Sequence, residues 1–375
     1  MNNNCSNFQN RFMLILIVLL ISACSNIQEI EESHLATVTE VNTLNNKEAE
    51  DTPIVSAVSI TVTDSENNIY LVDPRNLMIH AYSDELTYRW SAGGKGSGPG
   101  LFTSISALYA VDQQLYAYDA ANAIMTQYAL NGEMLEDWAY HEASQRMNSI
   151  RRMGNGKFLV AGWNEKSEIL VHLYSDNFKK KINSFIESDQ IFHSQRPALE
   201  KQVLRNFPGF VLPVNDSTVI YAPHSYNGTL PIYQIKNGHN WVKVDSIEGY
   251  NRFKDPIVFH YSSTGNSERS HLSGFDPRGG YFHTQFNSMS HGLYELNNGL
   301  IAHLSSRLKS NDQWDMIIEY FEPQSLKLKD FHIVKDLIPT FRPQQLPLWM
   351  DQKGQIYVSQ NSDIPLRILR IVNTD

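Results

Sequence analysis

The chain has 375 residues, of which 42% are hydrophobic and 19% charged, and its formal net charge at pH 7 is −9. A domain of this length buries about three-quarters of the surface that its unfolded chain exposes, so an apolar core can stabilise it. The acidic balance and the lack of a basic block argue against nucleic acid as a partner.

The first 23 residues have the organisation of a secretory signal peptide. Arg11 precedes an apolar run, residues 12–21, which is half as long as the about 20 residues of a membrane-spanning helix. The run ends in Ile21-Ser22-Ala23-Cys24, which resembles the bacterial lipobox. The resemblance implies cleavage before Cys24 and a lipid on its thiol. An ordinary secretory signal with an incidental cysteine is the alternative.

The mature chain would keep one cysteine, because Cys5 leaves with the signal peptide. An intramolecular disulfide and a cysteine-based metal site are then excluded. Residues 24–52 are polar and acidic, which is typical of a flexible tether, and residues 53–375 are expected to fold. Ser25 stands where an aspartate would signal retention in the inner membrane, so the resemblance to lipoproteins implies the outer membrane of the cell envelope.

The rest of the chain reads as short strands separated by turn clusters. Six apolar segments recur about every 45 residues, and a second strand follows each of them after a polar break. The segments are residues 64–73, 112–119, 156–160, 217–221, 298–302 and 351–359. The best candidate for a helix is short, residues 199–206.

This repeat predicts an all-β fold, a six-bladed β-propeller. A four-stranded sheet cannot bury both of its faces alone, whereas sheets packed around an axis do so and leave only short edges. The sixth unit lacks its last strand, and we expect residues 34–41 or 53–57 to supply it. The ring would then be closed by joining the N- and C-terminal strands. A large sandwich or two β domains are the alternatives.

The most distinctive segment is residues 93–102, GGKGSGPGLF. It fits neither phosphate-binding pattern, because Lys95 precedes glycines and Pro99 takes the place of the third glycine. We expect a tight crossover between two sheets, with glycines in left-handed conformations. Together with the preceding strand I-Y-L-V-D, the segment resembles the TolB-like and NHL-like six-bladed propeller lipoproteins over residues 59–128. The resemblance implies a propeller in the envelope and little about activity.

The sequence carries no nucleophile elbow and no kinase or oxidoreductase fingerprint, and no cofactor is predicted. Asp64, Asp73 and Asp119 follow or precede strands, where carboxylates usually accept backbone N–H groups in turns. The late histidines lack the spacing of a metalloprotease, and we place His291 and His303 beside strands and the others on loops. These others are His260, His271 and His283.

Two insertions, residues 189–208 and 249–287, stretch the repeat and are expected on one face of the propeller. Their cationic and aromatic side chains suit an acidic or glycan-like ligand. The predicted ligand-binding residues are His193, Arg196, Arg269, Phe275 and Arg278. Solvated loops that cap the channel are the alternative.

The sequence therefore favours an envelope lipoprotein that contacts the membrane through its lipid and binds a protein or glycan partner without catalysis. Some six-bladed propellers are calcium-dependent lactonases, whose oxygen ligands are scattered along the chain. A metal-dependent hydrolase of this type is the alternative function, although no motif of that family is matched here.

The lipobox yields a direct test. Replacing Cys24 with alanine removes the thiol that would carry the lipid, so Cys24→Ala should abolish metabolic labelling with a fatty-acid analogue. Cys5→Ala is the matched control and should label like the unaltered protein. Labelling of the Cys24→Ala protein would show that the lipid is attached elsewhere.

Overall fold

The computed structural model describes residues 33–46, 53–140, 147–164, 167–191, 196–262, 272–276, 280–309, 313–338, 348–359 and 363–373. Residues 1–23 and Cys24 lie outside these ranges, so the signal peptide and the lipid site stay predictions. Within the ranges, strands predominate, and the complete helices are α2 (Pro197–Asn206) and the 3-10 helix η1 (Ser188–Ile191). The helix α2 covers the short helix that the sequence predicts.

Four antiparallel sheets follow one another along the chain, each with four strands in chain order. The first contains β2 (Ile60–Thr63), β3 (Ile69–Asp73), β4 (Met78–Tyr82) and β5 (Tyr88–Gly93). The second contains β6 (Ile105–Val111), β7 (Gln114–Asp119), β8 (Ile124–Ala129) and β9 (Met134–Ala139). The third contains β10 (Met147–Arg152), β11 (Phe158–Gly162), β12 (Ile169–Tyr174) and β13 (Lys181–Glu187). The fourth contains β14 (Phe210–Asn215), β15 (Thr218–Ala222), β16 (Thr229–Lys236) and β17 (Asn240–Glu248).

An eight-stranded sheet, in the order β21-β22-β23-β24-β1-β27-β26-β25, consists of two further four-stranded groups. One group contains β21 (Ser288–Glu295), β22 (Ile301–Leu308), β23 (Trp314–Phe321) and β24 (Leu328–Ile338). The other contains β25 (Leu348–Met350), β26 (Ile356–Val358), β27 (Leu366–Asn373) and β1 (Leu35–Leu44). Two parallel residue pairs between β1 and β24 join the groups, Leu35 with Ile333 and Ala36 with Val334.

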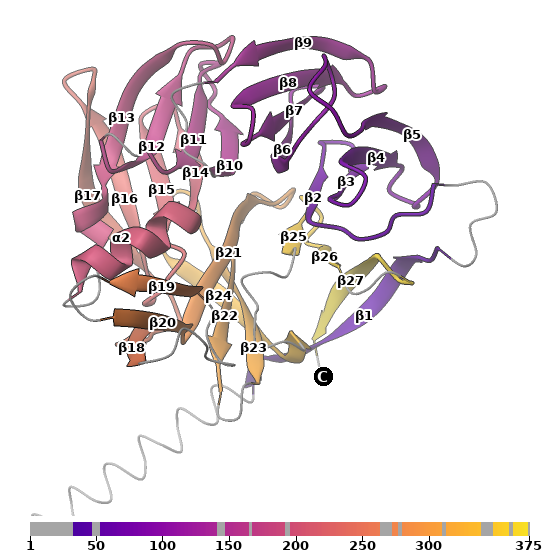
Figure 1. Cartoon of the computed structure of the whole chain (residues 1–375). Helices are drawn as coiled ribbons and strands as arrows, with labels where there is room; N and C mark the ends of the chain where they lie inside the picture. Colours follow the sequence, from indigo (N-terminus) through magenta and orange to yellow (C-terminus); the bar gives the residue numbers. More distant parts are fainter. Residues whose placement is uncertain are drawn as a thin grey trace, which may run out of the picture.

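The groups surround a common axis, as in a β-propeller. The first strand of each group contacts the first strands of its two neighbours, in the circular order β2, β6, β10, β14, β21, β25 and back to β2. Figure 1 shows the sheets fanning outward around this centre. Burial follows the same geometry, because every residue of β3, β11 and β15 is buried while β17 is mostly exposed. The six apolar segments aligned in the sequence contribute the second strand of each group.

The N-terminal strand closes the last group. β1 pairs antiparallel with β27 from Ala36–Asn373 to Leu44–Leu366, and Figure 1 shows the two strands side by side. Of the two segments considered for this role, the first is therefore used. The pairing also corrects the predicted domain boundary, since residues 35–44 fall within the expected tether but form a strand. Eight of the ten residues of β1 are exposed or half-buried, which accounts for its polar side chains.

Carboxylates fix the connections between strands, as expected. Asp73 accepts the Ser56 N–H at 3.1 Å and its hydroxyl, and Asp119 accepts the Thr103 N–H at 2.7 Å and its hydroxyl. Each carboxylate also accepts backbone N–H groups two and three residues later. Burial alone would raise the pKa of Asp73, but these hydrogen bonds lower it below its usual value.

A second carboxylate pattern recurs at two hairpins. Asp64 and Asp351 accept the hydroxyls of Tyr70 and Tyr357, at 2.9 Å in both cases. Each also accepts the N–H groups two and four residues later. The shared letters D-x-x-x-[NQ]-x-Y thus encode one local structure that appears in two groups.

The glycine segment is a crossover, as predicted. It connects β5 to β6, and Lys95 bridges to Phe102, which is fully buried. Gly93 has φ +94°, and a Cβ there would lie 2.9 Å from the Leu77 carbonyl oxygen and 3.1 Å from the Phe102 ring. Position 93 requires glycine because its backbone is in the left-handed region and the Leu77 carbonyl and the Phe102 ring leave no room for a Cβ.

The second insertion contains strands where the sequence predicts loops. β18 (Ile257–Ser262), β20 (Gly280–Phe286) and β19 (Leu272–Asp276) form a three-stranded sheet in that order. His260 and His283 face each other across β18 and β20, so their assignment to loops is wrong. His291 and His303 lie within β21 and β22, not beside them. Leu199 and Val203 of α2 share one apolar cluster with residues of β18 and β20, so the two insertions pack together.

Closure by β1 leads to a testable expectation. A chain that begins at residue 46 lacks β1, so β27 becomes an uncovered edge. The apolar surface that Ala36 and Leu44 cover in the complete fold would then be exposed. We expect its melting temperature to fall by on the order of 10 °C relative to a chain that begins at residue 33. Equal melting temperatures in calorimetry would mean that β1 contributes nothing to the fold.

Candidate functional site

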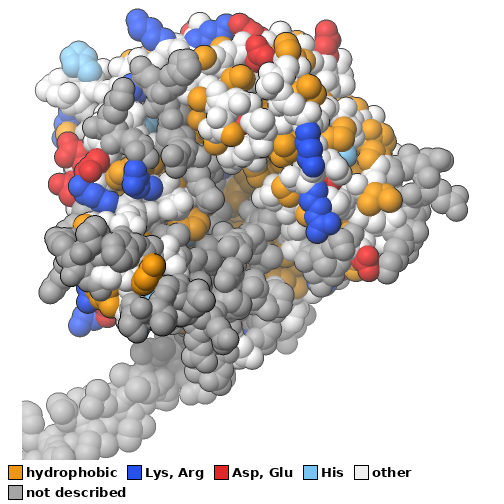
Figure 2. All heavy atoms as spheres, in the orientation of Figure 1, with side chains coloured by type: hydrophobic (Ala, Val, Ile, Leu, Met, Phe, Trp, Pro, Cys, Tyr) orange, Lys and Arg blue, Asp and Glu red, His pale blue; other side chains and the backbone are white. Residues whose placement is uncertain are grey.

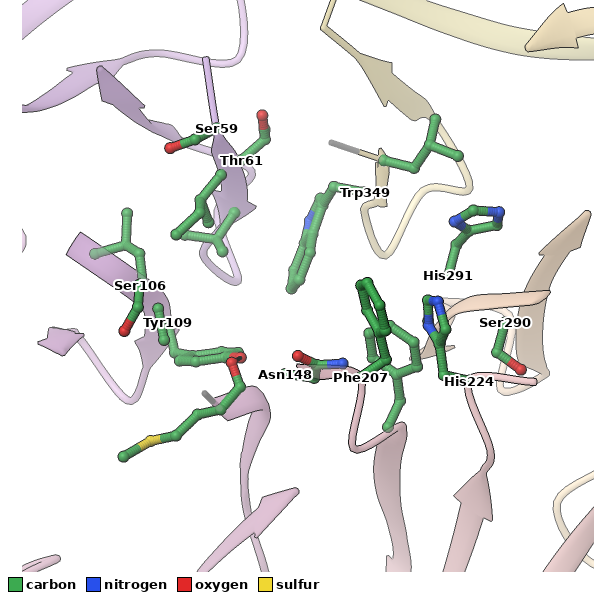
Figure 3. A pocket seen from close by; sticks show the side chains of 18 of the residues that line it. Ser59, Thr61, Ser106, Tyr109, Asn148, Phe207, His224, Ser290, His291 and Trp349 are labelled. Carbon is green, nitrogen blue, oxygen red and sulfur yellow. Dashed lines mark hydrogen bonds between the residues drawn. The ribbon is translucent and has the colours of Figure 1, made fainter. Parts of the chain in front are cut away.

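The first strands of the groups enclose a cavity of about 220 Å³ on the axis. All six of them, β2, β6, β10, β14, β21 and β25, contribute lining residues, together with the end of α2 and the segment after β15. Figure 3 shows Trp349, Asn148 and Tyr109 reaching toward the middle, with Phe207 and His224 opposite Tyr109. The cavity exists because strands arranged around an axis leave a space at the centre unless large side chains fill it.

Aromatic and aliphatic side chains form much of the wall. Phe207 stacks on His224 with ring centroids 4.5 Å apart, and Tyr294 meets Trp349 edge-on at 5.2 Å. The indole N–H of Trp349 donates to the Thr63 hydroxyl at 2.9 Å, which fixes the ring across the channel. The wall therefore offers flat apolar surfaces held in place by contacts on their far sides.

Arg151 is the charged residue of this wall, and no Asp, Glu or Lys is among the described residues that line the cavity. Its guanidinium donates to the carbonyl oxygens of Ile150 and Leu293, at 3.0 Å each. It also lies 5.7 Å from the centroid of the Trp349 ring, a cation–π contact. Burial lowers the pKa of the guanidinium, which nonetheless stays charged because arginine does not lose its proton in proteins.

Two tyrosines complete the surroundings of Arg151. Burial raises the pKa of Tyr109 and of Tyr294, so both phenols stay protonated. Tyr294 occupies its position because residue 292 is glycine: a Cβ there would lie 2.3 Å from the Tyr294 hydroxyl oxygen. We call Arg151 and the aromatic side chains around it, Tyr109, Tyr294 and Trp349, the neck of the axial channel. The neck thus contains one cation and neutral aromatic rings.

One of the two histidines that line the cavity, His291, carries no charge at neutral pH. Burial, followed by the neighbouring His303, lowers the pKa of His291 to about 3, and its Nε2 lies 2.8 Å from the Ser306 hydroxyl oxygen. Arg151 is thus the only Arg or Lys among the described residues of the wall, and the second lining histidine, His224, stacks on Phe207.

A wider cavity of about 920 Å³ lies on the other side of the neck and shares Arg151, Tyr294 and Trp349 with the first. Its wall includes four carboxylates, Asp64, Asp112, Asp216 and Glu295. Three of these have partners: Arg152 pairs with Asp112, the Asn155 N–H donates to Asp216, and Asp64 binds its own hairpin. The axial channel thus has an acidic vestibule and a cationic neck.

A buried chain of polar groups runs through three adjacent strands next to the cavity. The Ser290 hydroxyl lies 2.9 Å from His303 Nε2, and His303 Nδ1 lies 2.8 Å from a Glu319 oxygen. The other Glu319 oxygen accepts the Asn251 N–H at 3.0 Å and the Tyr250 N–H at 2.5 Å. The order serine, histidine, carboxylate is that of a catalytic triad.

The burial of these groups argues for a structural role. Ser290, His303 and Glu319 are all 0% exposed, and Figure 3 shows the Ser290 hydroxyl turned away from the middle of the cavity. A nucleophile must be reached by its substrate. Glu319 instead holds the backbone of the segment after β17 against β23, so the chain of hydrogen bonds connects the fourth group to the next.

The structure places two of the five predicted ligand-binding residues. Arg196 is exposed at the start of α2, and its guanidinium lies 4.7 Å from the centroid of the Tyr261 ring on β18. Phe275 lies on β19, where it pairs with Tyr281 of β20. His193, Arg269 and Arg278 lie outside the described residues, so the binding role of this set is untested.

The sequence analysis did not identify the axial residues. Tyr109, Arg151 and Trp349 come from first strands of different groups, the least distinct strands of the repeat. An arginine shortly before a repeated segment could have served as a signal, because the first strands of the blades line the axis of a propeller. The buried histidine–carboxylate pair had no such signal, because the spacing of His303 and Glu319 reflects only the register of two strands.

Other surface features are less specific. Figure 2 shows acidic and basic side chains interspersed over the described part of one face. No group of three or more His, Cys, Asp or Glu side chains that could hold a metal ion occurs in the described ranges. In the same ranges, no helix has the length and hydropathy that crossing a bilayer requires.

Solved structures with similar folds have little sequence identity to this chain. An exported protein from Bacteroides fragilis has a TM-score of 0.51 at 10% identity, covering 92% of this chain and 96% of that chain. A member of the DUF4221 family from Bacteroides vulgatus has a TM-score of 0.52 at 7% identity, covering 91% and 100%. Virginiamycin B lyase from Staphylococcus aureus reaches only 0.48 at 8% identity, covering 90% and 100%.

At these identities the likeness concerns the fold alone. No family model and no curated protein matches the chain. The resemblance to TolB-like and NHL-like propellers therefore stays a prediction at the level of the family, whereas the propeller-like arrangement of the sheets is observed.

The buried chain of polar groups can be tested by substitution. Glu319→Gln removes the charge that faces His303 and weakens the contacts to two backbone N–H groups, so we expect a loss of about 3 kcal/mol in the free energy of unfolding. Glu322→Gln, at an exposed position just after β23, is the control and should change stability by less than about 0.5 kcal/mol. A fluorophosphonate should not label Ser290 in the folded protein; labelling there would contradict the structural role.

Proposed function

We propose that this chain is an exported, lipid-anchored protein of the cell envelope whose six-bladed β-propeller binds a small ligand in the axial cavity. The observation that carries the proposal is the cavity itself, to which the first strands of all six groups contribute. Ligand sites in proteins are typically concave and mainly apolar, with a few convergent polar groups. The wall of the axial cavity combines apolar and aromatic side chains with convergent polar groups, among them Asn148, Arg151 and His224.

The count of six blades is supported by the strand groups. Four separate sheets and the two halves of the eight-stranded sheet each contain four antiparallel strands. The parallel contact between β1 and β24 involves two residue pairs, which fits the touching edges of adjacent blades better than a continuous sheet.

The envelope location is supported by the sequence around Cys24, with its charge, apolar run and small residues before the cysteine. A protein of similar fold is described as exported, which agrees with this location. Attachment to the outer membrane follows from Ser25 by resemblance to other lipoproteins.

Binding is favoured over catalysis by the chemistry of the axial wall. The described lining residues of the smaller cavity include no carboxylate that could act as a base, and one of its two histidines, His291, has a pKa far below neutrality. Ser290, which precedes His291 in β21, is fully buried. A protein or glycan partner at the two insertions is a separate proposal, which rests on the exposed pair Arg196 and Tyr261.

Filling the cavity tests the axial site. Asn148 reaches toward the middle of the cavity, so Asn148→Trp should remove the space that a ligand needs. Lys243→Trp, on the exposed outer strand β17, adds the same side chain elsewhere. In ligand-observed NMR with a fragment library, we expect hits for the unaltered protein and for Lys243→Trp that Asn148→Trp loses. The same hits in all three proteins would place binding outside the cavity.

A further inference from the structure

We propose that the neck of the axial channel binds the carboxylate of a small, mainly apolar organic acid, and that Arg151 is the residue that recognises it. This inference rests on the proposed ligand site and names the class of its ligand. It starts from a cation beside the axis that forms no ion pair with an acidic side chain in the part of the chain that the structure describes.

The acidic side chains that the structure describes leave the charge of Arg151 unpaired. Among the described residues, no Asp or Glu forms an ion pair with it, and the groups that act on it electrostatically are the protonated phenols of Tyr109 and Tyr294. Removing a cation from water without a partner is costly, so such groups are normally paired. The two carbonyl oxygens that accept from Arg151 offset part of this cost but leave the charge unbalanced.

The same two hydrogen bonds orient the guanidinium. Arginine has five N–H donors. The carbonyls of Ile150 on β10 and Leu293 on β21 belong to the third and fifth strand groups, and each accepts from one terminal nitrogen of the guanidinium. Trp349 restricts one face of the plane. A guanidinium whose position is already fixed loses little entropy on binding, and its remaining donors match the two oxygens of a carboxylate.

The charge balance favours a monoanion. Among the described residues that line the smaller cavity, Arg151 is the only Arg or Lys, and His291 stays neutral because burial lowers its pKa to about 3. A phosphate dianion would therefore remain partly uncompensated, and the carboxylates of the vestibule would disfavour it further. A monocarboxylate is neutralised by one arginine.

The size and the wall define the rest of the ligand. A cavity of about 150 Å³ holds benzene in another protein, so 220 Å³ accommodates a ring with a short acidic side chain. The wall includes apolar and aromatic residues, among them Val62, Leu108 and Phe207, beside polar ones such as Thr61 and Ser106. An aromatic or branched aliphatic acid would place its carboxylate against Arg151 and its apolar part against the apolar residues of the wall.

Three probes of equal size and different charge test this inference. Benzoate, benzyl alcohol and benzylamine would each be titrated calorimetrically into the full-length protein and into Arg151→Gln. We expect benzoate to bind more tightly than benzyl alcohol and benzylamine to bind least. Arg151→Gln should weaken benzoate binding about 10- to 100-fold and leave benzyl alcohol within about twofold.

Two further variants separate charge from geometry. Arg151→Lys keeps the charge but loses the planar fork, so it should bind benzoate with intermediate affinity. Arg89→Gln removes an exposed arginine on the outer strand β5 and should bind like the unaltered protein. Melting temperatures of all variants would show whether each is folded.

The outcomes distinguish the two proposals. Equal affinity for benzoate and benzyl alcohol, or benzoate binding that survives Arg151→Gln unchanged, would overturn the assignment of Arg151 while the axial site stands. Binding of benzylamine in preference to benzoate would assign the neck to cations and overturn it as well. If none of the probes binds, the axial ligand site itself is contradicted.

Discussion

The antiparallel pairing of β1 with β27 joins the two ends of the chain, and the axial architecture depends on it. Eight residue pairs, from Ala36–Asn373 to Leu44–Leu366, supply the fourth strand of the last group. Without that strand the group would end at an uncovered edge between two packed neighbours. The circular contacts among first strands, and hence the cavity that they enclose, require all six groups to keep their positions.

Polar groups reinforce this ring at its joints. Carboxylates at Asp73 and Asp119 hold the residue that leads into a first strand against the end of the second strand. Between the fourth group and β21, the Ser290–His303–Glu319 chain takes a comparable role from inside the core. Buried ionisable groups of this kind contribute to positional specificity, since removing one member leaves the others unsatisfied.

The local parts of the fold were predictable from the sequence, because they are determined by neighbouring residues. The Asp64 and Asp351 hairpins repeat one short sequence pattern, and the glycines in residues 93–102 indicate a crossover between two sheets. The N-terminal strand could be narrowed only to two segments, since its partner lies at the other end of the chain. The sheet β18-β20-β19 was missed, because it does not share the repeat, and the axial site was missed for a related reason. Tyr109, Arg151 and Trp349 become neighbours only through the angular arrangement of blades, which no local pattern records.

Closure by the N-terminal strand also affects the order in which this protein can fold. Glu40 and Arg367, which contact each other across β1 and β27, are 327 positions apart in the chain. Contacts of such separation form late, because the entropy of closing a long loop must be overcome before they stabilise anything. β1 must therefore wait for β27, which is synthesised much later. Until the whole chain has been made, β1 has no antiparallel partner, and the central channel cannot reach its final form.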